Sequence, residues 1–430
     1  MATTPPPQLR TAPRPAPLTP LLVFVFVSSL GTGAITHGVY FLTESALAYK
    51  SAQNYALAAM FGGIYIVSAA AAGPSLRRLA RRAPWLSTRG LLVLSVLLIA
   101  AACALPILTQ RPGAGARAWS LWVLLAVYAG ATGVLWPITE SYISGGRVGR
   151  AMRSATGRFN IAWSSATVAA LLLMGPMVRS APLEFLAIVG ALHLATLPLL
   201  WLLPPSPPPH PEDDHPDAPP RPEVYTRLLS AVRVMLPLSY LYASALIPQL
   251  PTALERLNVN ASWKPGVASV YLLARLVGFA LFERWHAWHG RRSMLWIGAA
   301  ILIVGFSLGV VSPELASRGL IDSHLGLALL TIGLALFGIG ASMIYAAAIY
   351  YAMAVGSASV DAGGTHEALI GCGYLLGPLC GLAALASASH AGIAPENATT
   401  IIVIFVSISI GIACWRVSAR RGKLWASSDV

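Results

Sequence analysis

Residues 324–354 read HLGLALLTIGLALFGIGASMIYAAAIYYAMA and contain no Asp, Glu, Lys or Arg. A helix needs about 20 mostly apolar residues to span the roughly 30 Å hydrocarbon core of a bilayer. The stretch is therefore long enough to cross a membrane as one helix. Its many Gly, Ala and Ser residues let helix backbones approach closely, which favours a packed bundle over a single lipid-facing rod.

Eleven other segments are also mostly apolar and close to the length that a membrane-spanning helix needs. The full set covers approximately residues 20–43, 53–75, 89–109, 119–142, 157–178, 182–203, 229–250, 263–283, 293–311, 324–354, 366–388 and 398–416. The chain is 56% hydrophobic and only 10% charged, whereas a soluble domain is about 25% charged. Because so few charges cannot cover so apolar a core in water, we predict an all-α membrane protein with twelve transmembrane helices in a lipid bilayer.

The net charge of +13 could indicate a nucleic-acid-binding protein. The basic residues instead lie in short clusters between the apolar segments, which is how membrane topology is set. We therefore expect no nucleic-acid partner. The four cysteines fall inside apolar segments without the spacing of a metal site or a disulfide framework, so we expect them to be small buried side chains.

A proline-rich stretch separates the sixth segment from the seventh. Residues 204–224 combine many prolines with the acidic residues Glu212, Asp213, Asp214 and Asp217. Nothing there can bury a core, which predicts a flexible linker. The linker divides the chain into an N-terminal six-helix bundle at 20–203 and a C-terminal six-helix bundle at 225–416. A disordered arm at 1–19 and a basic tail at 417–430 complete the expected organisation.

Arginine is unevenly distributed among the loops. Clusters at residues 77–82, 147–158 and 284–292 lie in alternate loops, and the intervening loops carry far fewer basic residues. Cytoplasmic loops hold the excess of Lys and Arg in membrane proteins, so we expect the clusters, the linker and both termini to be cytoplasmic. An even number of spans also requires the termini to share a side. We therefore predict a multi-pass protein of the cell membrane.

Two short patterns accompany this arrangement. Residues 73–82 read GPSLRRLARR after the second segment, and residues 371–381 of the eleventh read GCGYLLGPLCG. Together with six spans on either side of an acidic linker, these patterns make the chain resemble the major facilitator superfamily of transporters. That family usually carries Gly-x-x-x-Asp-Arg-x-Gly-Arg-Arg after its second helix, and a Gly-Pro pattern is common in its bundle helices. Here Arg77 stands in place of the Asp, and Ala80 in place of the second Gly.

The resemblance implies a substrate cavity between the two bundles. In this family segments one, four, seven and ten line it, with help from two, five, eight and eleven. The candidate cavity residues are therefore the polar and aromatic ones of these segments: Arg275, His37, Tyr128, Trp136, Asn160, Trp163, Tyr242, Gln249, Tyr271, Tyr345 and Tyr374. Such a set could hold sugars, amino acids, drugs or organic anions. Because aromatic residues also anchor helices at membrane interfaces, we expect part of the set to be structural.

Arg275 is the sharpest candidate, because a polar group inside a membrane is costly unless it faces a partner or water. It lies near the middle of the eighth segment, and we expect no Asp or Glu at a comparable depth. Its guanidinium could bind the charged group of an anionic substrate. Alternatively, it snorkels or meets a carboxylate from another helix. His37 could carry a proton, since histidine titrates near neutral pH, or it is a satisfied core residue.

The resemblance also places helices two and eleven together at the contact between the halves. Glu367 follows His366 in the first turn of the eleventh segment. Arg77 would be repelled by the positive amino end of that helix, and Glu367 could reverse the repulsion. We therefore expect a charge-swapped latch, Arg77 or Arg78 with Glu367, that closes the cytoplasmic side. The alternative is a set of solvated loop charges.

Glu140 is the other acidic candidate for gating or coupling. It lies at the cytoplasmic end of the fourth segment, three residues after Pro137. We expect it to pair with Arg158 at the start of the fifth segment or with a loop arginine.

The sequence thus predicts a secondary active or facilitative transporter of a small solute, such as an organic anion or amphipathic compound, working by alternating access as a monomer. It shows no phosphate-binding loop, metal cluster or nucleophile triad, so we expect no cofactor and no enzymatic activity. The membrane centre lacks a carboxylate, which argues against a simple acidic proton relay. Proton coupling through His37 or Glu367, a facilitator and an anion exchanger stay open. The altered loop motif favours an alternative: a non-transporting membrane sensor or partner subunit.

Overall fold

The computed structural model describes residues 14–110, 117–209, 223–355, 359–391, 398–409 and 412. Most of the predicted arm, most of the linker and the whole of the predicted tail lie outside these residues. The regular elements of the described residues are all helices. The predicted all-α class is therefore confirmed.

The N-terminal half consists of six spans. The first is α1 (Leu18–Thr32), a π-helical turn η1 (Gly33–Gly38) and α2 (Val39–Leu47) in direct succession. The others are α3 (Ser51–Arg82), α4 (Thr88–Leu108), α5 (Ala118–Ser144), α6 (Gly149–Ser180), and α7 (Pro182–Ala195) with the short α8 (Leu197–Leu200).

The C-terminal half repeats the pattern. Its first span is α9 (Glu223–Leu246) with the turn η3 (Ile247–Gln249) and α10 (Leu250–Arg256). The next are α11 (Lys264–Arg284), followed by the turn η4 (His286–Trp288), α12 (Ser293–Ser317), α13 (Ser323–Val355) and α14 (Val360–Ala391). Eleven spans of the described chain are long and apolar enough to cross a membrane. The apolar helix Ala398–Ser409 is the described part of the predicted twelfth span.

Several helices are longer than the apolar segments that predicted them. α3 continues to Arg82, α6 starts at Gly149 and α14 starts at Val360. The apolar pattern marks only the part of a helix that lies in lipid, whereas the backbone hydrogen bonds of a helix can continue into the polar region. For α14, this difference changes which acidic residue occupies the first turn.

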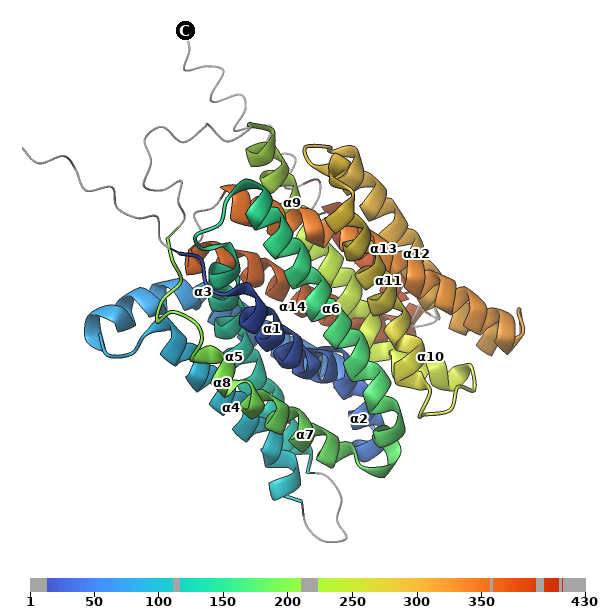
Figure 1. The fold of residues 1–430 in the computed structure, drawn as a ribbon. Helices are drawn as coiled ribbons and strands as arrows, with labels where there is room; N and C mark the ends of the chain where they lie inside the picture. The colour runs from blue at the N-terminus through green and yellow to red at the C-terminus, as the bar shows by residue number, and fades with distance from the viewer. Residues whose placement is uncertain are drawn as a thin grey trace, which may run out of the picture.

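The two halves adjoin along a small number of helices. In Figure 1 the N-terminal half (blue to green) and most of the C-terminal half (yellow-green to orange) form two groups, and α14 lies beside α3. The principal contacts between the halves are α14 with α3 and α5, and α11 with α6. The end of the bundle that holds Arg82, Ser144 and Glu223 is called the linker side. The end that holds Leu47, Ser51 and Lys264 is called the far side.

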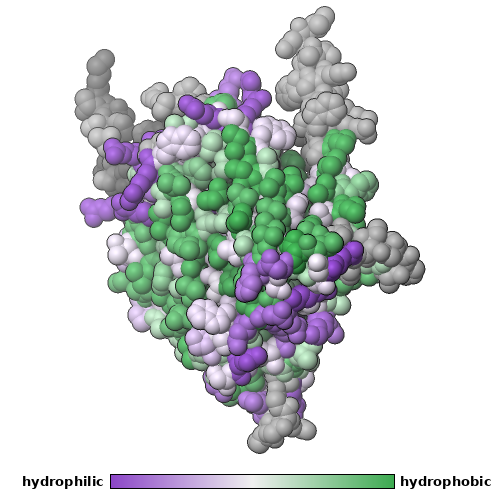
Figure 2. Space-filling view, turned by 90° about the vertical axis from the view of Figure 1, so that its right-hand side faces the viewer, coloured by the Kyte–Doolittle hydropathy of each residue, from purple (hydrophilic) through white to green (hydrophobic). Residues whose placement is uncertain are grey.

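The outer surface is apolar over a wide area. On the face shown in Figure 2, hydrophobic residues form a broad expanse, and hydrophilic residues gather toward its upper and lower parts. Large apolar side chains such as Val67, Leu173 and Phe405 are exposed. An apolar surface of this extent fits lipid as the surrounding solvent.

Two adjacent glycines of α3 show how closely the halves approach. A Cβ atom on Gly62 would overlap the backbone of Tyr374 and Leu375 in α14, whereas a Cβ on Gly63 would meet no heavy atom within 4 Å. Small residues permit such close helix contacts in membranes.

We predict that Gly62→Ala destabilises the protein by about 1–3 kcal/mol, since overpacking a close contact costs that much. Gly63→Ala is the matched control and should be neutral or slightly stabilising, because alanine is the better helix former. Thermal unfolding of both purified variants in the same detergent measures the difference. Equal melting temperatures for the two variants would contradict the close contact between α3 and α14.

Candidate functional site

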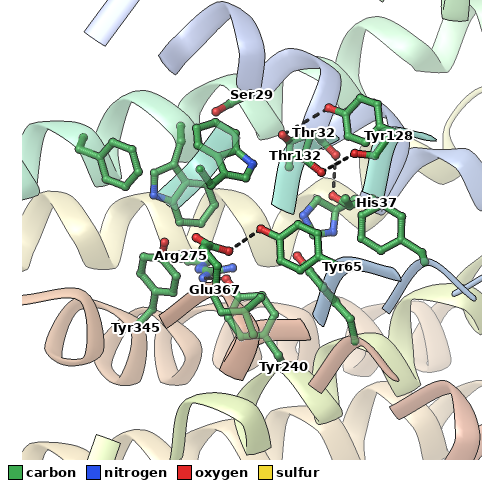
Figure 3. A pocket seen from close by; sticks show the side chains of 17 residues that line it. Ser29, Thr32, His37, Tyr65, Tyr128, Thr132, Tyr240, Arg275, Tyr345 and Glu367 are labelled. Carbon is green, nitrogen blue, oxygen red and sulfur yellow. Dashed lines mark hydrogen bonds between the residues drawn. The ribbon is translucent and has the colours of Figure 1, made fainter. Parts of the chain in front are cut away.

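A cavity of about 50 Å³ lies between the two halves near the middle of the spans. Figure 3 shows its side chains converging from helices of both halves. The lining residues are Ser29, Thr32, Thr36, His37, Phe61, Tyr65, Tyr128, Thr132, Trp136, Phe159, Trp163, Tyr240, Arg275, Tyr345, Glu367, Ile370 and Tyr374. This volume is small beside the roughly 300–1,000 Å³ of sites that hold drug-sized molecules.

The first span contributes a polar wall through its π-helical turn. The turn covers Gly33–Gly38 and places Thr36 and His37 on the cavity, one turn after Thr32. Such a turn widens a helix locally and often occurs at functional sites. The buried ring of His37 is within 2.7 Å of the Tyr271 hydroxyl through its Nδ1. Since His37 and Tyr271 belong to different halves, this hydrogen bond joins the halves behind the cavity.

Arg275 of α11 is enclosed by aromatic rings. Its guanidinium carbon lies 4.6 Å from the ring centroid of Trp163 and 4.8 Å from that of Tyr345. Its Nη2 donates a 2.9 Å hydrogen bond to the Tyr240 hydroxyl, and its Nε has no hydrogen-bond partner among the described residues. Aromatic faces attract the cation, but they accept few of its five N–H donors. The guanidinium therefore retains donors for a further group in the cavity.

A second aromatic group covers the α3–α14 contact. Phe61 and Tyr65 of α3 stack on each other, and each meets the ring of Tyr374 on α14 edge-on, with centroid separations of 5.7 and 5.8 Å. Tyr374 also meets Tyr240 edge-on at 5.2 Å. Edge-to-face contacts of this kind stabilise aromatic clusters. They surround the cavity with apolar faces, with hydroxyl groups at their edges.

An acidic group borders the same cavity. The Tyr65 hydroxyl donates a hydrogen bond to the carboxylate of Glu367 on α14. Figure 3 shows Glu367 and Arg275 among the side chains around the cavity. The expectation that no carboxylate lies near the depth of Arg275 is therefore wrong. It failed because packing brings the early turns of α14 level with the cavity.

Polar contacts join the halves on the far side. Lys264 of α11 and Glu44 of α2 form a nearly buried ion pair at 2.9 Å. Tyr55 of α3 donates a 2.7 Å hydrogen bond to the carbonyl oxygen of Ala245. These contacts join the two halves on the far side.

An ion pair also joins the halves on the linker side, but it is not the predicted one. Arg77 of α3 pairs with Asp361, which occupies the first turn of α14. The expected partner, Glu367, lies six residues further along, about 9 Å deeper at 1.5 Å per residue, and bonds Tyr65 instead. The predicted latch of Arg77 or Arg78 with Glu367 is therefore wrong in its acidic partner, which is Asp361. The prediction failed because α14 begins earlier than its apolar pattern indicates. Arg78 is exposed.

The expected pairing of Glu140 is also corrected. Glu140 is only 2% exposed, and neither of its carboxyl oxygens has a hydrogen-bond partner among the described residues. It faces α14, where a Cβ atom on Gly363 would lie 2.8 Å from its Oε2. Arg158 is exposed on α6. The two residues fail to meet because Glu140 points from α5 toward the contact between the halves.

The structure brings most of the predicted cavity residues together. Those that line the cavity are His37, Tyr128, Trp136, Trp163, Arg275, Tyr345 and Tyr374. Four other predicted residues do not line the cavity. Asn160 accepts a 3.2 Å hydrogen bond from the Trp163 indole, and Tyr271 lies behind His37. Tyr242 packs against Phe306, and Gln249 is buried in η3. Each lies on an expected segment but on another face or at another depth. Whether any of these residues contacts a solute stays a prediction.

Sequence reasoning missed several lining residues. The polar ones are Ser29, Thr32, Thr36, Tyr65, Thr132 and Tyr240. Thr32 and Thr36 repeat at an i, i+4 spacing that places both on one helix face, and this signal could have identified them. Tyr65 and Tyr240 carry no comparable pattern, because many tyrosines in these segments are structural.

No family model and no curated protein matches the sequence. Solved structures do match its fold. The nucleoside transporter NupG, in a mutant form, has a TM-score of 0.62 at 12% identity over 93% of this chain and 99% of that chain. A variant of the E. coli fucose:proton symporter FucP has a TM-score of 0.56 at 15% identity over 92% and 98%. The human organic anion transporter MFSD10 has a TM-score of 0.55 at 14% identity over 91% and 98%.

These matches extend over both halves of the chain. FucP is described in its solved structure as a major facilitator superfamily transporter. At identities this low, the likeness concerns the fold and not the substrate. The chain has the fold of the major facilitator superfamily transporters.

Proposed function

We propose that the protein is a secondary active or facilitative transporter that moves a small organic anion across a cell membrane by alternating access. The observation that carries this proposal is Arg275, a buried cation with free donors in a cavity between two helical bundles. A guanidinium binds carboxylate and sulfonate groups through paired, charge-assisted hydrogen bonds. The likeness to NupG, FucP and MFSD10 supports a transport function.

The surroundings of Arg275 favour a solute with an aromatic or apolar body. Trp163, Tyr345 and Tyr374 offer ring faces, while Thr32 and Thr132 offer hydroxyl groups. An anionic group on Arg275 and a ring against these faces would use both parts of the cavity. MFSD10 is an organic anion transporter by its own description, which agrees with this choice of solute class.

The placement of the ion pairs at the two ends supports alternating access. The far side is closed by Glu44 with Lys264, the linker side by Arg77 with Asp361, and the cavity lies between them. Opening one set while the other holds would expose the cavity to one side at a time. We place the linker side in the cytoplasm, in agreement with its basic loops, and we propose a monomeric unit that uses no cofactor.

We predict that Arg275→Gln weakens binding of aromatic carboxylates such as benzoate by about 10- to 100-fold, because a charge-assisted hydrogen bond contributes about 1.5–3 kcal/mol. Arg275→Lys keeps the positive charge but loses the planar guanidinium, so its affinity for benzoate should fall between those of the unmodified protein and Arg275→Gln. Arg227→Gln, which changes an exposed arginine of α9, is the control and should match the unmodified protein.

Thermal stabilisation by benzoate and by the neutral analogue benzamide measures this binding. Counterflow of labelled benzoate in proteoliposomes measures transport. Equal binding of benzoate by Arg275→Gln and the unmodified protein would contradict the role of Arg275. Binding without counterflow would favour the non-transporting sensor.

A second prediction concerns the far-side closure. The hydroxyl oxygens of Ser51 on α3 and Thr252 on α10 lie 3.4 Å apart across the halves. Two cysteine sulfurs at these positions could reach the roughly 2.05 Å of a disulfide with small side-chain rotations. The double variant Ser51→Cys/Thr252→Cys should lose counterflow under oxidation and regain it after reduction.

The two single cysteine variants are the controls, and oxidation should leave their counterflow unchanged. Full counterflow in the oxidised double variant, with the disulfide verified by mass spectrometry, would show that the far side need not open for transport.

A further inference from the structure

Three buried ionisable side chains meet on the linker side of the cavity. They are Glu140 of α5 and the neighbours His366 and Glu367 of α14. One oxygen or nitrogen atom from each lies within 4.8 Å of the others. Their exposed fractions are only 2%, 3% and 5%. The cluster is divided between the halves, because α5 belongs to the N-terminal half and α14 to the C-terminal half.

The hydrogen bonding of this cluster is incomplete. Both carboxyl oxygens of Glu140 and the Nε2 of His366 have no partner among the described residues. Glu367 accepts a hydrogen bond from Tyr65. Two ionised carboxylates this close and this dry would repel each other, and each would lose its hydration. When two carboxyl groups share such a site, one of them holds a proton. A proton between them would let Glu140 donate to Glu367 and would remove the repulsion.

The surrounding charges fit a single proton. The charged and titratable groups around the cluster and on the cavity that Glu367 borders are His37 of η1, Tyr65 of α3, Tyr128 of α5, Tyr240 and Arg233 of α9, Arg275 of α11, Tyr345 of α13 and Tyr374 of α14. Arg233 is exposed and thus solvated, and the Arg77–Asp361 pair is neutral as a unit. Arg275 is then the one buried, permanently charged cation among these groups. With one shared proton, the remaining negative charge on the two glutamates balances Arg275.

A divalent metal ion would fit less well. It would neutralise both glutamates and leave the charge of Arg275 uncompensated in a dry, aromatic environment. A histidine and two carboxylates are nevertheless suitable ligands for zinc or cobalt, so a metal site is the alternative to a proton site.

A small second cavity gives His366 a connection toward the linker side. It measures about 30 Å³ and is lined by His366 and Thr365 of α14, by Arg233 and neighbouring residues of α9, and by Ala348 and Ala352 of α13. A cavity of about 10–15 Å³ can hold one water molecule. An imidazole can accept a proton on one nitrogen and release one from the other. His366 therefore borders both the carboxyl pair and a space large enough for water.

We propose that Glu140 and Glu367 form a proton-binding site divided between the two halves, and that His366 passes its proton to and from the linker side. The shared proton stabilises the closed linker side, because it bonds a carboxyl group of one half to a carboxylate of the other. When the halves separate there, the bond between the two carboxyl groups breaks and the proton leaves through His366 to water. The role of this proton in transport rests on the proposed function, whereas its binding does not.

The first test measures the proton directly, by pH-difference infrared spectroscopy of the full-length protein in nanodiscs. The C=O stretching band of a protonated carboxylic acid should appear in the spectrum of the unmodified protein and disappear as the pH is raised. Because the proton is shared, Glu140→Gln and Glu367→Gln should each abolish this band. Glu314→Gln, at a carboxylate already paired with Arg256 and Arg318, is the matched control and should retain it. Persistence of the band in Glu140→Gln/Glu367→Gln would overturn the proposal.

The second test separates a proton from a metal ion. Calorimetry with Co²⁺ should show no stoichiometric binding to the unmodified protein. One bound Co²⁺ with a visible ligand-field spectrum, lost in both Glu140→Gln and His366→Ala, would identify a metal site and overturn the proposal.

The third test concerns transport. In proteoliposomes, a pH gradient should drive accumulation of labelled benzoate by the unmodified protein, and Glu140→Gln should lose this accumulation. Accumulation that persists in Glu140→Gln would overturn the coupling role of the pair. Absence of benzoate counterflow by the unmodified protein would instead count against the proposed function. The infrared band would still decide whether Glu140 and Glu367 share a proton.

Discussion

The structure depends on one constraint: a charge buried within a membrane must be met by protein groups, because lipid offers it no partner. The chain satisfies this constraint for Arg275 and Glu367 by placing both where the two halves meet. Arg275 lies among the rings of Trp163, Tyr240 and Tyr345, and Glu367 accepts a hydrogen bond from Tyr65. The lipid-facing surfaces can then remain apolar. The contact between the halves becomes the polar, adjustable part of the molecule, and the cavity lies within it.

The same constraint links the cavity to both closures. Each closure joins an acidic residue of one half to a basic residue of the other: Glu44 to Lys264 on the far side, and Asp361 to Arg77 on the linker side. The far-side pair is nearly buried and the linker-side pair is about half exposed, so water screens the second more strongly. The linker side therefore needs a further interaction to hold it closed, and the buried carboxyl pair behind it is placed to provide one.

Much of this could be predicted from the sequence, and the failures have physical causes. The lengths of the apolar segments predicted the helices, because a helix needs about 20 apolar residues to span the hydrocarbon core. The aromatic and polar residues of the expected cavity segments included Arg275, His37 and Trp163, which do line the cavity. The depth of Glu367 could not be predicted, because α14 starts at Val360, six residues before its apolar pattern. The direction of Glu140 and the π-helical turn of the first span depend on packing against other helices, which no local pattern records.

The central claim is that the two ends open alternately around the Arg275 cavity. The most direct measurement is pulsed electron resonance on two pairs of spin labels, one pair on Arg150 and Arg292 at the linker side and one on Gln53 and His324 at the far side. All four positions are exposed, and each pair joins the two halves. We predict that raising the pH removes the shared proton and lengthens the linker-side distance, while the far-side distance does not lengthen. Distances that stay fixed at both ends, or lengthen together, would contradict alternating access.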